Sequence, residues 1–350
     1  MARRKGRRKI ASNDLLGLVS RVLAVAVSLW SFCQWNSDTR TPDPVRAVLD
    51  AQFEVELASC KSKIRDQGRK PRFCVHCPPT AHNPNGMNLL PLPEGLPRLV
   101  TNCSHTDAGV HLIDVTAAAN FEGWSSDTSC KILFNLEPPA VYELLYGFDM
   151  SIVLDRYGPV ADLFLSPGNA PPGMRAHPLI PANTWIQSTD QGMHPKTKQV
   201  SIVASSKTAL IGHQLRHEVI NSLGEKHGVH ALGRGYRPFD NKADGLRDYR
   251  FSIVIENIIE PFFITEKLID AFLTGTVPIY WGSPIATQLF DARGMFVFST
   301  IQDLDDILTR ATEAEYEKML PYIRENLARA KNFQFIEQFL DRYYLGRLSD

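Results

Sequence analysis

The sequence lacks a surplus of charge of either sign, because 38 lysines and arginines are matched by 38 aspartates and glutamates. A basic field that would draw nucleic acid to the whole protein is therefore absent. No internal repeat and no low-complexity run stands out in the 350 residues. The ordinary share of hydrophobic residues, 44%, allows about two domains with cores of their own. The composition favours a globular protein whose partners are small molecules or glycans.

Cysteine is scarce, and all six cysteines lie in the first half of the chain. Cys33 falls in an apolar stretch, and five others remain: Cys60, Cys74, Cys77, Cys103 and Cys130. Disulfides are expected in an oxidising compartment, but five cysteines leave one unpaired and the sequence does not give the connectivity. Cys74-Val-His-Cys77 resembles half a zinc site, yet no second Cys-x-x-Cys or His-x-x-x-His follows. A local disulfide or two packed thiols is the expectation for this pair.

Charge and hydrophobicity are unevenly distributed at the N-terminus. Residues 1–14 are rich in lysine and arginine, and residues 15–35 are mostly apolar. This order predicts a basic cytosolic tail and a transmembrane signal anchor. Arg21 interrupts the apolar stretch, so it would have to reach the interface, or the segment is a cleaved signal peptide. A nucleic-acid or nuclear tail is the other reading. The polar residues 36–72 are expected to form a stem.

Residues 73–195 read as a small α/β domain on the N-terminal side. Short apolar runs at 110–115, 131–136 and 151–154 are predicted strands. Glu137 stands just after the second run and before a predicted helix at 141–145, at the strand end where catalytic groups are commonly found. Tyr142, Glu143 and Glu122 are the alternatives, and a surface glutamate beside a proline turn is the structural reading.

A proline-containing and glycine-containing linker at 178–198 marks the predicted domain boundary. A strand at 200–204 and a helix from Ile211, ended by Gly224, open the second domain, 196–350. Arg216 lies beside the apolar face of that helix, where a guanidinium could hold phosphate in a bidentate way or simply be solvated. His213 and His217 are interpreted as ordinary residues of the helix surface. Gly233-Arg234-Gly235 suggests a tight turn near a nucleotide.

The most informative stretch is 249–284, which reads as one complete β-α-β unit. A buried strand at 251–255 is followed by Glu256 and Asn257, a helix capped by Thr265 and ended by Gly275, and a strand at 276–281. A helix N-terminus at the carboxyl ends of parallel strands favours an anion, and Lys267 in the first turn fits a bound phosphate. Carboxylates such as Glu256 and Glu266 accept hydrogen bonds from ribose or sugar hydroxyls.

The pattern E-N-x7-T-E-K-x2-D-A-x3-G-T-V-P-I-Y-W-G-S-P, residues 256–284, is similar to the donor-binding motif of the α-1,3/4-fucosyltransferases of glycosyltransferase family 10. The resemblance is close over 200–284 and loose from residue 99 to the end. It implies the GT-B fold, two Rossmann-like α/β domains facing across a cleft. It also implies an inverting enzyme that moves fucose from GDP-fucose to a hydroxyl of GlcNAc or glucose in a glycan or glycoprotein acceptor, as an α-1,3-fucosyltransferase does.

The resemblance also suggests roles for particular residues. Glu137 would be the general base, and six residues would bind the donor: Arg216, Glu256, Asn257, Phe263, Glu266 and Lys267. Arg216 and Lys267 would hold the pyrophosphate, so that no metal cofactor is required, although a divalent cation such as Mn²⁺ could stimulate. Asp303-Leu304-Asp305 has the spacing of a sugar-nucleotide metal motif but opens a distant helix. A Golgi membrane location, single-pass with the catalytic domain in the lumen, completes the expectation.

Four positions depart from the family's usual pattern. Ile258 stands where serine is common, and Phe263 stands where tyrosine is common, so two hydroxyls are missing. Glu260-Pro261 differs in character from the usual small or polar residues. These departures leave open an enzyme of the same fold that uses another GDP-sugar, or a glycan-binding pseudoenzyme.

Overall fold

The computed structural model describes residues 43, 45–46, 49, 51–65, 73–76, 99–100, 109–125, 129–147, 149–170 and 175–349. The predicted tail at 1–14 and anchor at 15–35 lie outside these residues. Among the helices that are described, none has the length and apolar character needed to cross a membrane.

The described N-terminal part contains a six-stranded sheet in the order β2-β1-β3-β4-β5-β6, and every neighbouring pair is parallel. Its strands are β1 (Phe73–His76), β2 (Leu99–Val100), β3 (Val110–Asp114), β4 (Cys130–Phe134), β5 (Leu163–Ser166) and β6 (His177–Pro178). All residues of β3, β4 and β5 are buried, as expected of a parallel sheet covered on both faces. The strands predicted at 110–115 and 131–136 are confirmed.

The strand predicted at 151–154 is wrong, because these residues belong to helix α5 (Met150–Tyr157). Asp149 caps the helix by accepting a hydrogen bond from the backbone N–H of Ser151. Met150, Leu154 and Tyr157 are the buried positions, and their spacing is helical. The short apolar run was therefore one turn of an amphipathic helix. Helix α4 (Pro139–Tyr146) precedes it and follows the segment that carries Glu137.

Helix α3 (Ala51–Arg65) lies within the segment 36–72 that was expected to be a stem. Phe53, Leu57 and Ile64 of this helix are buried in the core. Cys60 forms a disulfide with Cys130 at the start of β4. Residues 51–65 are therefore part of the folded domain, because their apolar side chains cover its sheet.

The C-terminal part contains a five-stranded parallel sheet in the order β11-β10-β9-β7-β8. Its strands are β7 (Lys198–Val203), β8 (His230–Leu232), β9 (Tyr249–Ile255), β10 (Val277–Trp281) and β11 (Phe296–Val297). The order is that of a doubly wound α/β fold, with the carboxyl ends of β7 and β9 side by side. The expected strands at 200–204, 251–255 and 276–281 are confirmed to within two residues.

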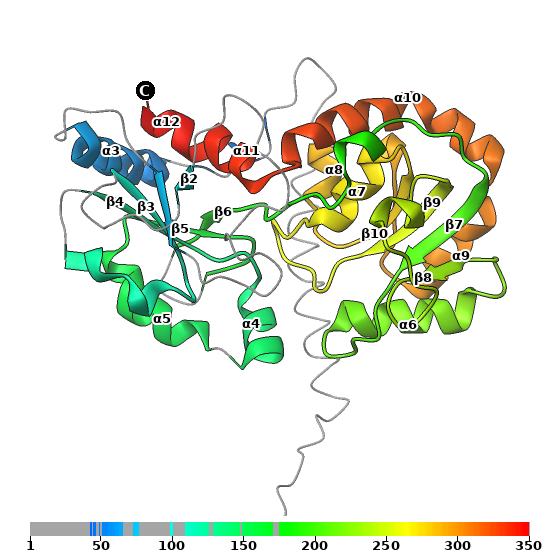
Figure 1. Ribbon diagram of the computed structural model, residues 1–350, viewed down its shortest axis with the longest axis horizontal. Helices are drawn as coiled ribbons and strands as arrows, with labels where there is room; N and C mark the ends of the chain where they lie inside the picture. Colours follow the sequence, from blue (N-terminus) through cyan, green and yellow to red (C-terminus); the bar gives the residue numbers. More distant parts are fainter. Residues whose placement is uncertain are drawn as a thin grey trace, which may run out of the picture. The chain divides into compact units, whose positions relative to one another are not determined.

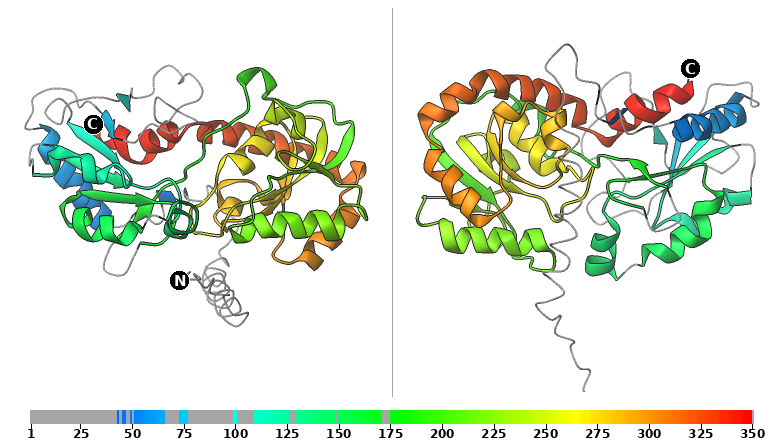
Figure 2. Two further views of the ribbon diagram at one scale, coloured as in Figure 1. Left: turned by 60° about the horizontal axis from the view of Figure 1, so that its bottom comes forward. Right: turned by 180° about the vertical axis from the view of Figure 1, so that it is seen from behind.

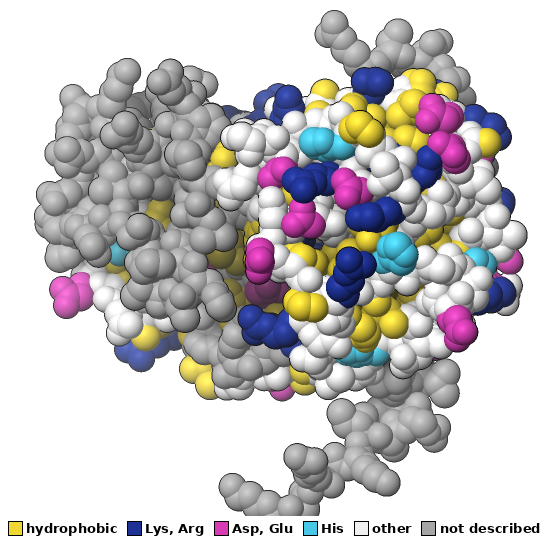
Figure 3. Space-filling model, turned by 45° about the vertical axis from the view of Figure 1, so that its right-hand side comes forward, with side chains coloured by type: hydrophobic (Ala, Val, Ile, Leu, Met, Phe, Trp, Pro, Cys, Tyr) yellow, Lys and Arg dark blue, Asp and Glu magenta, His cyan; other side chains and the backbone are white. Residues whose placement is uncertain are grey.

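Helices cover both faces of this second sheet (Figures 1 and 2). Helix α6 (Ile211–Leu223) contacts β9 on one face, and α7 (Glu266–Leu273) with α10 (Glu313–Ala330) lies on the other. Helices α8 (Ala286–Leu289) and α9 (Ile301–Arg310) complete this part. On the face drawn in Figure 3, described lysines and arginines are interspersed with aspartates and glutamates. That mixture agrees with the balanced overall charge.

The last described helices, α11 (Ile336–Leu340) and α12 (Gly346–Ser349), return to the N-terminal sheet. Arg347 pairs with Glu54 of α3 at 2.7 Å, and the Tyr344 hydroxyl donates to the carbonyl of Pro178 at the end of β6. Residues expected to extend the second domain therefore pack against elements of the first.

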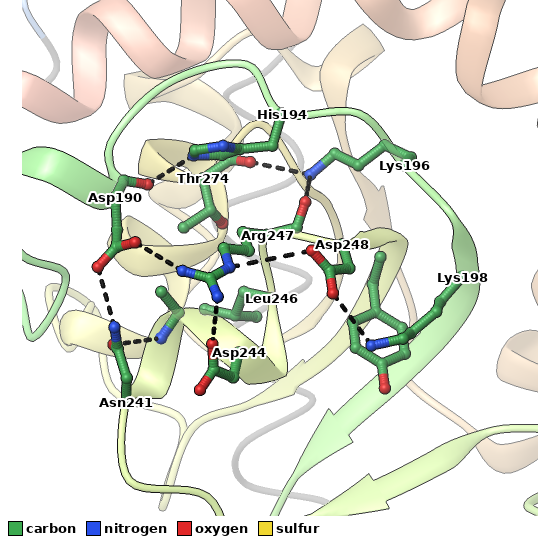
Figure 4. A network of polar contacts seen from close by, with 12 residues as sticks. Asp190, His194, Lys196, Lys198, Asn241, Asp244, Leu246, Arg247, Asp248 and Thr274 are labelled. Carbon is green, nitrogen blue, oxygen red and sulfur yellow. Dashed lines mark hydrogen bonds and ion pairs between the residues drawn. The ribbon is translucent and has the colours of Figure 1, made fainter.

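The amino ends of the second sheet are closed by a polar network (Figure 4). The ammonium of half-buried Lys196 donates to the carbonyls of Arg247 and Thr274 at 2.8 and 2.9 Å, and to the Thr276 hydroxyl at 3.0 Å. Arg247 in turn contacts Asp190 at 2.7 Å. Ligands of such sheets bind at the opposite, carboxyl edge, so this charged cluster is structural.

Candidate functional site

The site begins where β9 ends at Glu256. The Glu256 carboxylate accepts hydrogen bonds from the backbone N–H of Thr265 at 2.9 Å and from its hydroxyl at 2.7 Å. Thr265 is the N-cap of α7, as predicted, and accepts from the N–H of Lys267. Glu256 is fully buried, so it fixes the start of α7 instead of facing a ligand itself.

Lys267 is the partly exposed cation of this helix start. Its ammonium lies 3.2 Å from a Glu266 oxygen and 3.5 Å from a Glu256 oxygen, and it donates to the Thr265 hydroxyl at 3.0 Å. Burial alone would lower the pKa of Lys267, but the charges of Glu266 and Glu256 raise it. The side chain stays cationic and keeps 24% of its surface exposed, which leaves room for an anion.

Glu266 stays ionised because two lysines flank it. Burial would raise its pKa, yet Lys267 and Lys242 lower that pKa to about 2. Lys242 lies in the 3₁₀ turn η5 (Lys242–Gly245), 3.5 Å from Glu266 and 2.7 Å from the fully buried Asp270. Sequence reasoning missed Lys242, since nothing in its local pattern connects it with a helix more than twenty residues later.

Arg216 reaches the same strand end from α6. Its guanidinium donates to the carbonyl of Ile255 at 3.1 Å and to the Asn257 side-chain oxygen at 3.1 Å. Burial lowers the pKa of Arg216, and the charges of Glu256 and Glu266 oppose that effect. Two of the predicted donor residues, Arg216 and Asn257, are therefore in direct contact at the carboxyl end of β9.

The close approach of α6 depends on Gly212. A Cβ at this position would lie 1.8 Å from the carbonyl oxygen of Glu256, a distance that no side chain tolerates. The Gly212 N–H donates to the carbonyl of Asn257 at 3.0 Å. His213 follows, and burial together with the charge of Arg216 lowers its pKa to about 4, so it is neutral. It is a buried residue of the site, where the sequence suggested a surface one.

Glu137 follows β4, and the charges of Lys267, Glu266 and Glu256 act on its carboxyl group. Its pKa is raised to about 7, chiefly by burial, while Lys267 lowers it and Glu266 raises it. Its Oε2 atom is buried and has no hydrogen-bond partner among the described residues. Asn135 holds the turn by donating from its side chain to the Glu137 carbonyl at 2.7 Å. A carboxyl with a pKa near neutrality and a vacant acceptor oxygen can take a proton from a bound hydroxyl.

The alternatives to Glu137 differ from it in burial. Glu122 and Glu143 are exposed. Tyr142 is buried, and burial with the charge of Asp114 raises its pKa well above the ordinary value. Its phenolic oxygen is hydrogen-bonded by the backbone at Leu136 and Glu137. Tyr142 thus supports the turn that carries Glu137 and remains protonated.

Phe263, like Glu256, is fully buried. Its ring belongs to the interior, and the hydroxyl that a tyrosine would add is absent. Ile258 is partly buried. The structure therefore brings together Glu137, Glu256, Glu266 and Lys267 by charge, and Arg216 with Asn257 by contact, while the Phe263 side chain is turned to the core.

A polar pocket of about 430 Å³ lies beside α6. It is lined by Ser206, Thr208, Gln214, His217, Asn221, Gly235 and Tyr236. Gly233 has φ +111°, and a Cβ there would lie 2.2 Å from the carbonyl of Ala204, so glycine is required for this turn. His217 bonds to the Tyr236 hydroxyl and to the carbonyl of Lys207. The lining is rich in hydrogen-bonding groups, which suits a polar ligand.

Two groups of side chains among the described residues have ligand atoms close enough for a metal ion. One is Cys74, His76 and His111, and the other is Cys60, Cys130 and Asp162. Cys74 is disulfide-bonded, as are Cys60 and Cys130. None of these sulfurs is a thiolate, so the donor sets do not fit a zinc site.

Residues 193–320 match the family described as glycosyltransferase family 10 (fucosyltransferase) C-term. An alpha-(1,3)-fucosyltransferase of Helicobacter pylori is 31% identical over 110 residues, which are 31% of this chain and 23% of that protein. A fucosyltransferase-like protein of Arabidopsis thaliana is 26% identical over 138 residues, 37% of this chain and 27% of that protein. The matched part thus spans about a quarter of each relative.

Among solved structures, an alpha1,3-fucosyltransferase with GDP-fucose superimposes with a TM-score of 0.45 at 15% identity, over 76% of this chain and 90% of that one. The sequence match runs from β7 into the first half of α10, and it includes the elements that carry Arg216, Glu256, Asn257, Glu266 and Lys267. The motif proposed from residues 256–284 falls inside it. Residues 193–320 are thus similar to the C-terminal part of the fucosyltransferases of glycosyltransferase family 10.

Proposed function

We propose that this protein is an inverting α-1,3-fucosyltransferase that moves L-fucose from GDP-fucose to a hydroxyl of GlcNAc or glucose in a glycan. The single observation that carries the mechanism is Glu137, whose Oε2 atom is buried without a hydrogen-bond partner among the described residues and whose pKa is about 7 beside the charges of Lys267 and Glu266. The family match supports the donor, because it covers the expected donor-binding elements.

In the proposed reaction, Glu137 removes the proton of the acceptor hydroxyl. The oxygen then attacks the anomeric carbon of β-linked fucose, and the bond from that carbon to the GDP oxygen breaks on the opposite face. The product is an α-linked fucoside, and GDP leaves with one more negative charge. A pKa near neutrality suits this step, because the base is ionised before the reaction and holds the proton after it.

The leaving diphosphate needs compensating charge. Lys267 is cationic, partly exposed and at the N-terminus of α7, and Arg216 provides the second positive group nearby. Cations that act on the developing charge stabilise the transition state more than the substrate. Two fixed cations are the basis for proposing a reaction with no required metal. Glu266 and Asn257 are assigned to ribose or sugar hydroxyls, and Glu256 supports them through Thr265.

The polar pocket beside α6 is the proposed place of the nucleotide base, because His217 and Gln214 of its lining belong to the helix that carries Arg216. We further propose the GT-B arrangement for the two sheets, and a Golgi membrane location through the anchor expected at 15–35. That location would place the folded domain in the lumen, where the Cys60–Cys130 disulfide can form.

The test is acceptor-dependent GDP release by the purified protein, with GDP-fucose and GDP-mannose offered separately to a mixed set of glycans. Glu137→Gln should abolish release while GDP still binds, and exposed Glu143→Gln on α4 is the matched control. Lys267→Ala should weaken GDP binding, with exposed Lys318→Ala as its control. Release from GDP-mannose alone would move the assignment to another GDP-sugar, as Ile258 and Phe263 allow. GDP binding without release from either donor would favour the pseudoenzyme.

A further inference from the structure

Two loops that leave different sheets meet beside the candidate site. One is 166–169, after β5 of the first sheet, and the other is 256–265, after β9 of the second. The backbone N–H of Phe262 donates to the carbonyl of Pro167 at 2.9 Å. The backbone of Asn169 is hydrogen-bonded to the Glu260 carboxylate. We call these two contacts the loop junction.

The junction is closely packed at Gly168. This glycine is buried, and a Cβ there would lie 3.1 Å from a Glu260 carboxylate oxygen and 3.2 Å from its Cδ. Either the Glu260 side chain or the loop would have to move to admit a methyl group. The Gly168 N–H donates to the Ser166 hydroxyl at 3.1 Å, so this turn is itself held in place.

On the first sheet, the junction is next to the segment that carries the proposed base. β5 is the direct neighbour of β4, with Leu165 opposite Phe134. The backbone N–H of Asn135 donates to the carbonyl of Leu165 at 3.2 Å. A shift of residues 166–169 would therefore be transmitted to Asn135, whose side chain holds the carbonyl of Glu137.

On the second sheet, the loop 256–265 lies between residues that are expected to bind the donor. Glu256 and Asn257 open it, and Thr265 to Lys267 close it. The middle of the loop is fixed by the Ser283 hydroxyl, which donates to the carbonyl of Pro261 at 2.5 Å. Glu260 therefore sits on a segment whose two ends both bear on the expected diphosphate site.

We propose that Glu260 is a positioning residue that sets the distance between Glu137 and the donor-binding loop. The inference rests on the proposed transferase function, and it assigns a role to the glutamate that departs from the family's usual pattern. Glu260 acts through the loops and does not touch substrate. The Glu260 carboxylate lies against the position that a Cβ at residue 168 would occupy, so Gly168 and Glu260 form one functional unit.

The test compares Gly168→Ala, Glu260→Ala, the double variant and Glu260→Gln, with exposed Glu225→Ala as a matched control. Misplacement of reacting groups by about 1 Å can cost about 100-fold in rate, so Gly168→Ala should lower kcat by about tenfold or more. The affinity for GDP should stay within about threefold, because the cations of the second sheet are untouched. Glu260→Gln, which keeps shape and an acceptor oxygen, should retain most of the activity.

The double variant gives the decisive comparison. In the Glu260→Ala background, Gly168→Ala should cost little further activity, since the group it collides with is gone. Fully additive losses would overturn the inference, as would losses of kcat that follow equal losses of GDP affinity and of melting temperature. Variants with wild-type kcat would overturn it as well. An inactive wild type with every acceptor would instead overturn the proposed function, and the positioning role with it.

Discussion

Glu137 is a carboxyl group whose ionised form the fold disfavours, so its replacement by glutamine should change stability in a pH-dependent way. Burial raises the pKa of Glu137 to about 7, from 4.5 for a free side chain. The folded protein therefore binds this proton more tightly than the unfolded chain does. Its contribution to stability is full below about pH 4.5 and is lost as the pH rises through 7.

The expected magnitude follows from these two pKa values. At pH 8 the ionised group lowers the free energy of unfolding by about 3 kcal/mol, and at pH 5 by less than about 1 kcal/mol. Glutamine never ionises, but its amide would bring an unpartnered donor to the position of Oε2, at about 1 kcal/mol. Glu137→Gln should thus stabilise the protein by about 2 kcal/mol at pH 8 and have little effect at pH 5.

The assay is urea unfolding of the wild type and Glu137→Gln at pH 5 and pH 8, with Glu143→Gln as the exposed control. The pH dependence of all other groups cancels in the difference between wild type and variant. A difference that is the same at both pH values would refute the reasoning. So would a variant that is less stable at pH 8, because both results require a Glu137 that ionises freely. The same variant should lack transfer activity, so that stability and function move in opposite directions.

Three further predictions concern the frame of the site. Lys267→Met should raise the dissociation constant for GDP by roughly 30-fold or more, as loss of a partly buried charge pair costs about 2–5 kcal/mol, and titration calorimetry measures it; unchanged affinity would remove Lys267 from the diphosphate site. Gly212→Ala should destabilise the protein by about 2 kcal/mol or more, because the added Cβ would collide with the Glu256 carbonyl, even though alanine favours helices. Thermal unfolding measures this effect. An unchanged or higher melting temperature would mean that the contact relaxes freely. Lys196→Met should lower the free energy of unfolding by about 2 kcal/mol, because the carbonyls of Arg247 and Thr274 would lose their hydrogen-bond donor. The affinity for GDP should not change, and weaker GDP binding would contradict a purely structural network.

The parts of the fold that could be predicted are those with strong local signals. Thr265 as a cap and the apolar face of residues 268–273 specified helix α7 without reference to any other part of the chain. The buried strands β7, β9 and β10 could be predicted because they are short runs rich in β-branched residues between turn residues. Helix α6 was predicted at its observed bounds because its apolar residues recur at helical spacing and Gly224 follows it.

The rest depends on tertiary contacts that no local pattern contains. The run at 151–154 is compatible with a strand until Asp149 is seen to cap a helix. The burial of α3 depends on which sheet it covers. Cys60 of this helix is joined to Cys130, which is 70 residues away in the sequence. The importance of Lys242 for Glu266, and the burial of Phe263, likewise arise from packing between distant segments. Sequence reasoning therefore named residues that the structure brings close together, and it missed Lys242, which helps to keep Glu266 ionised.

The Cys60–Cys130 bond has a practical consequence for how this protein is produced. It joins α3 to the strand that ends just before Glu137, and loss of a native disulfide typically costs about 2–5 kcal/mol. Protein made in the reducing cytosol of an expression host would lack this bond. If such protein were inactive, the missing disulfide could be the cause, and the result would not test the proposed function. Protein secreted through an oxidising compartment is the proper starting sample. Mass spectrometry of the linked peptides should precede every kinetic comparison.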